Sequence, residues 1–269
     1  MLACAAMSIG QALVLGAVQG MTEFLPISSS AHLYIIPTLL HWPYAGVAFD
    51  VALHWGTLLA LVLAFWRDWW TLARDAFASA GAARADAWRT LLKLLAASVP
   101  AAVAGVLLEK QAETWFRSLP LQASTLFGFG FLLWWVDRVR TESREEREPG
   151  WGTCMLIGAA QTLALVPGVS RSGVTITAGR AAGLSRVSAA RFSFLLATPI
   201  TFGAGLVEMR HLDSGLPPQA LVAGVVSAAV VGLLAIRGLM RWLGPVGFFP
   251  FFAYRAALAL YILYRISRG

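Results

Sequence analysis

The stretch GAVQGMTEFLPISSS (residues 16–30) returns in altered form as GAAQTLALVPGVSRS (158–172). A shift of 142 positions places Gln19 on Gln161 and aligns the last serine of the two copies. Both copies begin apolar and end in hydroxyl-rich residues beside a proline, a composition that suits a lipid-facing helix poorly. Two such interruptions with complementary polar residues indicate an internal duplication that builds one composite site.

The composition of the whole chain is that of a membrane protein. Of 269 residues, 58% are hydrophobic and 13% are charged, and the mean hydropathy is +0.68. A soluble domain carries about 25% charged residues. The net charge of +7 does not indicate nucleic acid, because the arginines lie mostly at the ends of apolar runs, where membrane topology explains them. The two cysteines, Cys4 and Cys154, provide neither a disulfide framework nor a metal cluster.

Six apolar runs are long enough to cross about 30 Å of hydrocarbon as helices. They cover residues 46–66, 89–108, 119–137, 187–207, 217–237 and 247–266. Two other regions, 7–40 and 151–180, each read as a short apolar helix, a Pro/Ser break and a second short helix. We expect re-entrant hairpins there, because broken backbone at membrane depth needs protein or water around it.

The predicted fold is therefore an all-α integral membrane protein with about six transmembrane helices and two re-entrant helical hairpins. The chain is expected to form a single membrane domain, 1–269, with repeat one at about 7–137, repeat two at about 151–266 and a charged linker at 138–150. Three predicted spans separate the two hairpins. Because this number is odd, the second repeat would have inverted topology.

The distribution of basic residues predicts the orientation. The loops expected at 67–88, 138–150, 180–186 and 237–245 share one face of this topology. That face carries Arg67, Arg74, Arg84, Arg138, Arg140, Arg144, Arg147, Arg180, Arg186, Arg237 and Arg241, whereas the other carries Lys110, Arg117, Arg210, Arg265 and Arg268. The positive-inside rule makes the first face cytoplasmic, so both termini and the mouth of the first hairpin would lie outside.

The first break contains a carboxylate. Glu23 follows Gln19 by four residues, so the two share a helix face. A carboxylate in a membrane segment is costly and usually marks an ion or substrate path. The alternative is a purely structural role, in which Glu23 accepts hydrogen bonds that hold the hairpin together.

Three consecutive serines, Ser28, Ser29 and Ser30, follow this carboxylate and precede His32. Serines at a break often cap the next helix, but three in a row exceed what capping needs. His32 comes three residues after Ser29, so a hydroxyl and a potential base can meet across one turn. This spacing favours nucleophilic chemistry.

The second break, PGVSRSG (167–173), indicates an anion site. Gly168 and Gly173 permit tight turns and a close approach of a ligand. Hydroxyl, guanidinium and backbone donors at a helix N-terminus come from Ser170, Arg171 and Ser172. Helix N-termini and the forked donors of arginine both suit phosphate. Arg171 could also pair with the carboxylate of the first break, which does not exclude phosphate binding.

The sequence does not assign a role to three further polar residues, Asp50, His54 and Arg255. His54 lies one turn after Asp50, where it could orient a metal or water or simply bond the end of a helix. Arg255 lies inside a predicted span, where pairing between helices or snorkelling to the interface is the default explanation.

The motifs QGMTEFLPISSSAH (19–32), DVALHWGTLLA (50–60) and PGVSRSGVT (167–175) resemble those of the undecaprenyl pyrophosphate phosphatases, the bacitracin-resistance family of bacterial membrane proteins. The resemblance covers essentially the whole chain. It implies a multi-pass protein of the bacterial inner membrane that removes the terminal phosphate from a C55 isoprenyl diphosphate and so recycles the lipid carrier for peptidoglycan synthesis. The family's serine pair falls on Ser28 and Ser29, its histidine on His32 and its arginine on Arg171.

On this resemblance, the diphosphate is expected to bind Arg171 and its neighbours; that set is Ser28, Ser30, Gly168, Ser170, Ser172 and Gly173. Glu23 and Gln19 would position a divalent cation, Mg²⁺ or Ca²⁺, which prefer oxygen ligands. Ser29 would be the nucleophile with His32 as its base or proton donor, or His32 would attack phosphorus itself. The expected partners are a polyprenyl diphosphate lipid and the membrane, not nucleic acid, and a homodimer is left open.

A transporter is the competing functional class. Inverted repeats with broken helices and a polar centre are also the plan of secondary transporters. A lipid-phosphate flippase would need Arg171 and Glu23 for binding, but it would need no nucleophile. Such an activity could stand alone or be combined with the phosphatase.

Overall fold

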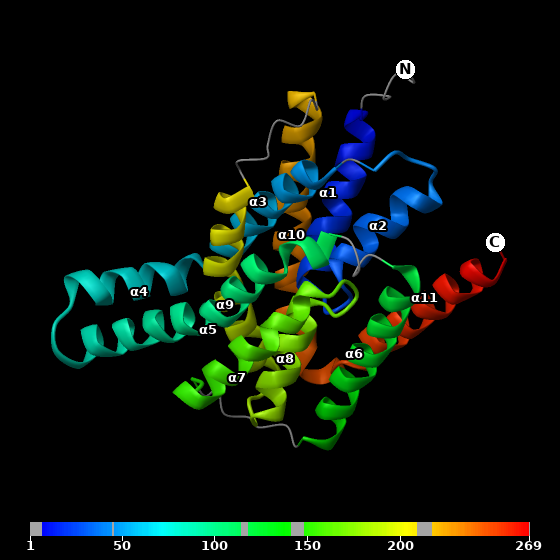
Figure 1. Cartoon of the computed structure of the whole chain (residues 1–269). Helices are drawn as coiled ribbons and strands as arrows, with labels where there is room; N and C mark the ends of the chain where they lie inside the picture. Colours follow the sequence, from blue (N-terminus) through cyan, green and yellow to red (C-terminus); the bar gives the residue numbers. More distant parts are fainter. Residues whose placement is uncertain (1–6, 45, 114–117, 141–147, 209–216, 269) are drawn as a thin grey trace.

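A computed structural model shows the chain as an assembly of helices packed side by side (Figure 1). It describes residues 7–44, 46–113, 118–140, 148–208 and 217–268. Cys4, Arg117, Arg144, Arg147 and Arg210, and the side chain of Lys110, lie outside the described residues. Every regular element within the described ranges is helical.

Both predicted hairpins contain two helices around a break. In the first, α1 (Ile9–Phe24) and α2 (Ser29–Leu39) flank residues 25–28. In the second, α7 (Trp151–Gln161) continues into a 3-10 turn, η2 (Thr162–Leu165), and α8 (Arg171–Ala181) follows the break. Pro26 and Pro167 lie in these breaks, where their missing N–H groups do not interrupt a helix.

The two breaks share an unusual backbone. Ser28 has a φ of 75° and Ser170 a φ of 72°, which is the left-handed region that residues other than glycine seldom adopt. These serines are 142 positions apart, the same shift that aligns the two sequence copies. The loops that follow also match, since His41 (φ 53°) and Gly183 (φ 90°) are again 142 positions apart.

The remaining long helices occupy the positions of the six expected spans. They are α3 (Val47–Ala64), α5 (Gly81–Glu113), α6 (Leu119–Val139), α9 (Arg186–Glu208), α10 (Pro218–Val246) and α11 (Phe249–Arg268). Among the described residues, α5, α6, α9 and α10 are long and apolar enough to cross a membrane, and α3 with the helix after it would make a fifth. The expected sixth, α11, is long enough but carries Arg255 and a basic last turn.

Two stretches expected to be loops are helical. Residues 67–88 form α4 (Trp66–Ala78) and the first turns of α5, and α4 leaves α3 at a 70° bend. These two helices form a hairpin that projects from the rest of the protein (Figure 1). Residues 237–245 continue α10, because Leu239 and Leu243 recur at helical spacing and are buried. In both stretches the charged residues among the apolar ones suggest a loop, but the structure places them on amphipathic helices.

Each hairpin packs through glycine onto a long helix of the opposite half. A Cβ atom on Gly16 of α1 would lie 2.3 Å from the carbonyl oxygen of Gly224 in α10. A Cβ atom on Gly158 of α7 would lie 2.3 Å from the carbonyl oxygen of Ala97 in α5. Glycine therefore permits backbone-to-backbone contact, as small residues do in membrane helix packing. These contacts hold both breaks against the centre of the protein.

A buried ion cluster joins α6, α8 and α9 at one end. Arg180 is 1% exposed, and its Nε donates to Asp137 Oδ1 at 3.0 Å. Arg186 donates to both oxygens of the same carboxylate, with its Nε and Nη2 each at 2.9 Å from the nearer oxygen. The loop predicted at 180–186 does connect α8 and α9, but its two arginines bind a buried carboxylate. Arg180 is buried with Asp137, whereas Arg186 is 21% exposed.

Candidate active site

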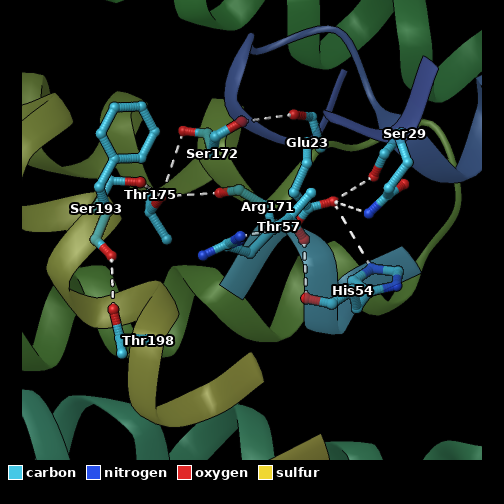
Figure 2. Close-up of polar contacts among 12 residues, drawn as sticks. Glu23, Ser29, His54, Thr57, Arg171, Ser172, Thr175, Ser193 and Thr198 are labelled. Atoms are coloured by element: carbon cyan, nitrogen blue, oxygen red, sulfur yellow. Dashed lines mark hydrogen bonds and ion pairs between the residues drawn. The ribbon is translucent and has the colours of Figure 1, made fainter. Parts of the chain in front are cut away.

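The carboxylate of Glu23, on the last turn of α1, is the point where four side chains meet (Figure 2). Its Oε1 accepts a hydrogen bond from Arg171 Nη2 at 2.6 Å. Its Oε2 accepts bonds from the Ser29 hydroxyl at 2.6 Å and from the Gln19 amide at 3.2 Å. The Nε2 of His54 lies 3.7 Å from the same oxygen. Helices α1, α2, α3 and α8 thus contribute side chains to one centre.

Arg171 is the first residue of α8, directly after the second break. Its side chain is 15% exposed and uses Nη2 for the bond to Glu23. Its Nη1 is buried and has no hydrogen-bond partner among the described residues. A buried guanidinium nitrogen without an acceptor costs free energy of folding. This indicates that a ligand oxygen accepts its hydrogen bond when substrate is bound.

The N-terminus of α8 adds further donors beside this arginine. The Ser170 hydroxyl caps the helix by accepting the N–H of Gly173 at 3.2 Å, and it lies 3.3 Å from the Ser172 hydroxyl. Ser172 also donates to the carbonyl of Leu25 in the first break, at 3.4 Å. The two breaks are therefore in direct contact, and the positive end of the α8 dipole points toward the centre.

Ser29 and His32 are not brought together. In the described part of the chain, the Ser29 hydroxyl bonds only Glu23. His32 is buried, with its Nδ1 2.7 Å from the Ser28 carbonyl oxygen and its Nε2 2.6 Å from the Tyr254 hydroxyl. The imidazole also stacks on the ring of Tyr254 at 5.6 Å. Both ring nitrogens of His32 are thus occupied. They bind the Ser28 carbonyl and the Tyr254 hydroxyl, and neither contacts the hydroxyl of Ser29.

His54 is the histidine that faces the carboxylate. Its Nδ1 lies 2.7 Å from the backbone carbonyl of Asp50, which can only accept a hydrogen bond. Nδ1 therefore carries a proton, and Nε2 is the ring nitrogen that faces Glu23. Its side chain is 38% exposed against 9% for Glu23, so His54 lies on the open side of the centre. The sequence placed His54 one turn after Asp50 but gave no sign of this contact.

Glu23 and Gln19 could bind a divalent cation if the substrate supplied most of the other ligands. Gln19 is fully buried, and its Oε1 has no hydrogen-bond partner among the described residues, although its amide nitrogen bonds Glu23. No group of three or more His, Cys, Asp or Glu suited to a metal occurs in the described ranges. A carboxylate and one orphaned amide oxygen suit Mg²⁺ or Ca²⁺ when phosphate oxygens and water complete the coordination.

The other predicted site residues lie at the breaks. The Ser30 hydroxyl is 3.2 Å from that of Ser28, which mirrors the pair of Ser170 and Ser172 at the start of α8. Gly168 has a φ of 91°, and a Cβ atom there would lie 2.1 Å from the Thr125 hydroxyl of α6. That hydroxyl donates to the carbonyl of Pro167 at 2.7 Å. Gly168 therefore fixes how the second break rests on α6.

Arg255 of α11 connects the two breaks and was not expected to do so. It is fully buried, and its Nη1 donates to the Pro26 carbonyl at 3.0 Å, while its Nη2 donates to Gly168 at 2.8 Å and Val169 at 3.1 Å. Its Nε donates to the carbonyl of Leu126 at 2.9 Å. One guanidinium thus satisfies carbonyls that neither break could pair within a helix.

Comparison with known proteins gives consistent matches over nearly the whole chain. The family described as bacitracin resistance protein BacA matches residues 12–261. The undecaprenyl-diphosphatase of Pelotomaculum thermopropionicum is 48% identical over 259 residues, covering 96% of this chain and 97% of that protein. The undecaprenyl-diphosphatases of Moorella thermoacetica (48% identical, covering 96% of this chain and 97% of that protein) and Gemmatimonas aurantiaca (46%, covering 95% and 97%) are also similar.

Proposed function

The chain belongs to the bacitracin resistance protein BacA family, and from this membership and the site's chemistry we propose that it is an integral membrane undecaprenyl-diphosphatase. It hydrolyses undecaprenyl diphosphate to undecaprenyl phosphate and inorganic phosphate. Its partners are a polyprenyl diphosphate lipid and the membrane. The membrane is the bacterial inner membrane, where this reaction regenerates the lipid carrier for peptidoglycan synthesis.

The observation that supports this function best is the hydroxyl of Ser29 held on Glu23 beside Arg171. A carboxylate that accepts a serine proton is the arrangement of an activated nucleophile. An arginine with one nitrogen on that carboxylate and another without a partner can hold the phosphoryl group being attacked. A flippase would need the cation but not the activated hydroxyl.

We assign the first step to Ser29. Its Oγ attacks the terminal phosphorus, the bond from that phosphorus to the bridging oxygen breaks, and undecaprenyl phosphate leaves. The serine proton passes to Glu23 across the 2.6 Å hydrogen bond. Arg171 and the N-terminus of α8 stabilise the charge that develops on the phosphoryl oxygens. In this assignment His32 is a positioning residue that maintains the turn at Ser28.

The second step hydrolyses the phosphoserine. Water attacks the phosphorus, the bond to Ser29 Oγ breaks, and that oxygen takes back the proton held by Glu23. The proton of the attacking water passes to Nε2 of His54, which faces the centre from its open side. A divalent cation held by Glu23 and Gln19 would neutralise charge on the diphosphate when bound.

We further propose that the protein is an inverted repeat of two halves with re-entrant hairpins. The matching positive φ angles at Ser28 and Ser170, and at His41 and Gly183, support two copies of one backbone design. The crossed packing of α1 on α10 and of α7 on α5 supports it as well. With the arginine-rich face cytoplasmic, the substrate enters from the outer side.

Phosphate release by the purified protein in detergent tests this function. The substrates are undecaprenyl and farnesyl diphosphate, assayed with Mg²⁺, with Ca²⁺ and with EDTA. We expect cation-dependent release, and a loss of about 100-fold or more in Glu23→Ala, Arg171→Ala and Ser29→Ala. Thr38→Ala is the matched hydroxyl control, because Thr38 lies on the same helix and its hydroxyl bonds only the Tyr34 carbonyl among the described residues.

Binding of the diphosphate lipid, measured on the same purified protein, separates the two functional classes. A folded wild type that binds the diphosphate lipid but releases no phosphate would overturn the phosphatase assignment and leave the transporter. Equal losses in Thr38→Ala and Ser29→Ala would show that α2 tolerates no change, and the nucleophile assignment would then fail. Trapping of a phosphoserine at position 29 would establish it directly.

A further inference from the structure

An apolar stripe runs along the outer face of α10. Val222, Val226, Val230 and Leu234 follow one another at four-residue spacing, and each side chain is more than half exposed. Residues at this spacing lie on one side of a helix. The stripe is roughly 18 Å long at 1.5 Å per residue, which is comparable to half of the roughly 30 Å hydrocarbon core. One acyl chain of one leaflet has this length.

The stripe leads to a cavity with a surplus of positive charge. The cavity has a volume of about 860 Å³, and its lining includes Leu234, Arg191, Arg237 and Arg241. Asp68 is the one carboxylate in that lining, and it pairs with Arg191. Trp242, also in the lining, is largely exposed, as aromatic side chains are at the membrane interface.

Arg237 and Arg241 have no carboxylate partner in the described part of the chain, although they are one helical turn apart. Like charges at this spacing destabilise a helix. An anion placed between the two guanidinium groups would remove that repulsion and gain forked hydrogen bonds. The position suits a headgroup, because the two arginines follow the apolar stripe in the last turns of α10, a helix of 29 residues, roughly 44 Å, that is longer than the hydrocarbon core.

The Asp68–Arg191 pair also lines a second cavity. It has a volume of about 380 Å³, shares both of those residues, and adds Arg67, Lys93 and Glu148 to the lining. The two cavities together therefore present five cationic side chains against two carboxylates. Neither cavity contains Glu23 or Arg171, so both are separate from the candidate active site.

We propose that the cavity beside Arg237 and Arg241 binds the headgroup of an anionic glycerophospholipid, with one acyl chain along the stripe on α10. The phosphodiester bridges the two arginines, and the apolar stripe distinguishes a phospholipid from free phosphate. The surplus of positive charge selects a net anionic headgroup over a zwitterionic one. This site serves the leaflet on the arginine-rich face and does not depend on the phosphatase reaction.

Native mass spectrometry of the purified protein tests the proposal, with phosphatidylglycerol and phosphatidylcholine of identical acyl chains as probes. We expect preferential binding of phosphatidylglycerol, and a loss of that preference by roughly tenfold in Arg237→Gln/Arg241→Gln, since each arginine near a membrane surface contributes to anionic lipid binding. Arg265→Gln/Arg268→Gln is the matched control, because it removes the same charge from the exposed end of α11. Phosphate release in detergent should stay at the wild-type rate in both.

Three outcomes would overturn the proposal. The first is unchanged lipid preference in the Arg237→Gln/Arg241→Gln variant. The second is an equal loss in the control pair, which would mean that total charge and not the cavity selects the lipid. The third is displacement of phosphatidylglycerol by millimolar inorganic phosphate, which would identify a free-phosphate site instead.

Discussion

Glu23 is bonded on both carboxylate oxygens, and the partners differ in what they can do. Arg171 can only donate, and it stays charged throughout the reaction. Ser29 donates a proton that it can lose, and His54 approaches from the exposed side with a nitrogen that can accept one. Glu23 is therefore in contact with a residue that can bind phosphate (Arg171), a nucleophile (Ser29) and a proton acceptor (His54).

Substitution of the two histidines should separate their roles. His54→Gln should leave the first step fast and slow the second, because the attacking water loses its proton acceptor. The measurement is a rapid burst of undecaprenyl phosphate followed by phosphate release that is roughly 100-fold slower. His32→Gln should instead lower the midpoint of thermal unfolding, because it disturbs the contacts to Ser28 and Tyr254, and it should show no burst.

The opposite pattern would contradict this assignment. If His54→Gln behaves like wild type while folded His32→Gln loses phosphate release, proton transfer belongs to His32 despite its bonds to Ser28 and Tyr254. Tyr254→Phe is the useful companion variant, because it removes the partner of His32 Nε2 and keeps the stacked ring. It should reproduce the stability loss of His32→Gln in part, without changing the burst.

At the level of helices and breaks, Gly168 and Gly183 provide a matched pair. Both have a φ near 90°, so alanine at either position meets the same backbone strain of roughly 1 kcal/mol. Only at Gly168 would the new Cβ also collide, at 2.1 Å from the Thr125 hydroxyl and 2.8 Å from the Gln122 carbonyl, whereas nothing lies within 4 Å at Gly183.

Gly168→Ala should therefore destabilise the protein by roughly 2 kcal/mol more than Gly183→Ala. It should also reduce phosphate release, because the second break carries Arg171 only three residues later. Thermal unfolding and phosphate release of the two variants measure both effects. Equal losses would show that backbone strain alone matters and that the contact with α6 does not position the site.

The breaks and their polar residues could be predicted from sequence, because proline, glycine and serine inside an apolar run are local signals. The bend after α3 could not, since Phe65 lies there with neither proline nor glycine beside it. Arg255 could be recognised as a buried charge but not assigned a role. Its acceptors are backbone carbonyls between 86 and 229 positions away. Every residue has a backbone carbonyl, so the sequence does not reveal which ones accept these bonds.

For the molecule as a whole, Arg255 is a buried residue that binds backbone carbonyls of both breaks. Arg255→Lys keeps the charge but replaces five forked donors with three on a flexible stem, so several carbonyls of the two breaks lose their partners. We expect the unfolding midpoint to fall by several degrees and phosphate release to drop together with it. Arg265→Lys on the same helix is the control, since Arg265 is exposed and its guanidinium bonds only Tyr261 within the described ranges. If Arg255→Lys kept wild-type stability, the guanidinium would not be needed to hold the two breaks together.

The proposed inverted repeat makes a prediction about the two faces of the membrane. His41 and Gly183 occupy corresponding loops, are exposed, and lie 142 positions apart, so inversion puts them on opposite sides. In a background in which Cys4 and Cys154 are replaced by alanine, His41→Cys should react with a membrane-impermeant maleimide in intact cells. Gly183→Cys should react only after permeabilisation, because the proposed topology puts its loop on the arginine-rich, cytoplasmic face.

The pair of labels distinguishes three arrangements. Reaction of both cysteines from one side would rule out inversion, and the equal φ angles at Ser28 and Ser170 would then describe a parallel repeat. Reaction of Gly183→Cys alone in intact cells would keep the inversion but reverse the orientation, and it would move substrate entry to the cytoplasmic side. Only the predicted pattern places the strained turn beside Ser29 on the hairpin that opens outward, where the diphosphate lipid would meet Glu23 and Arg171.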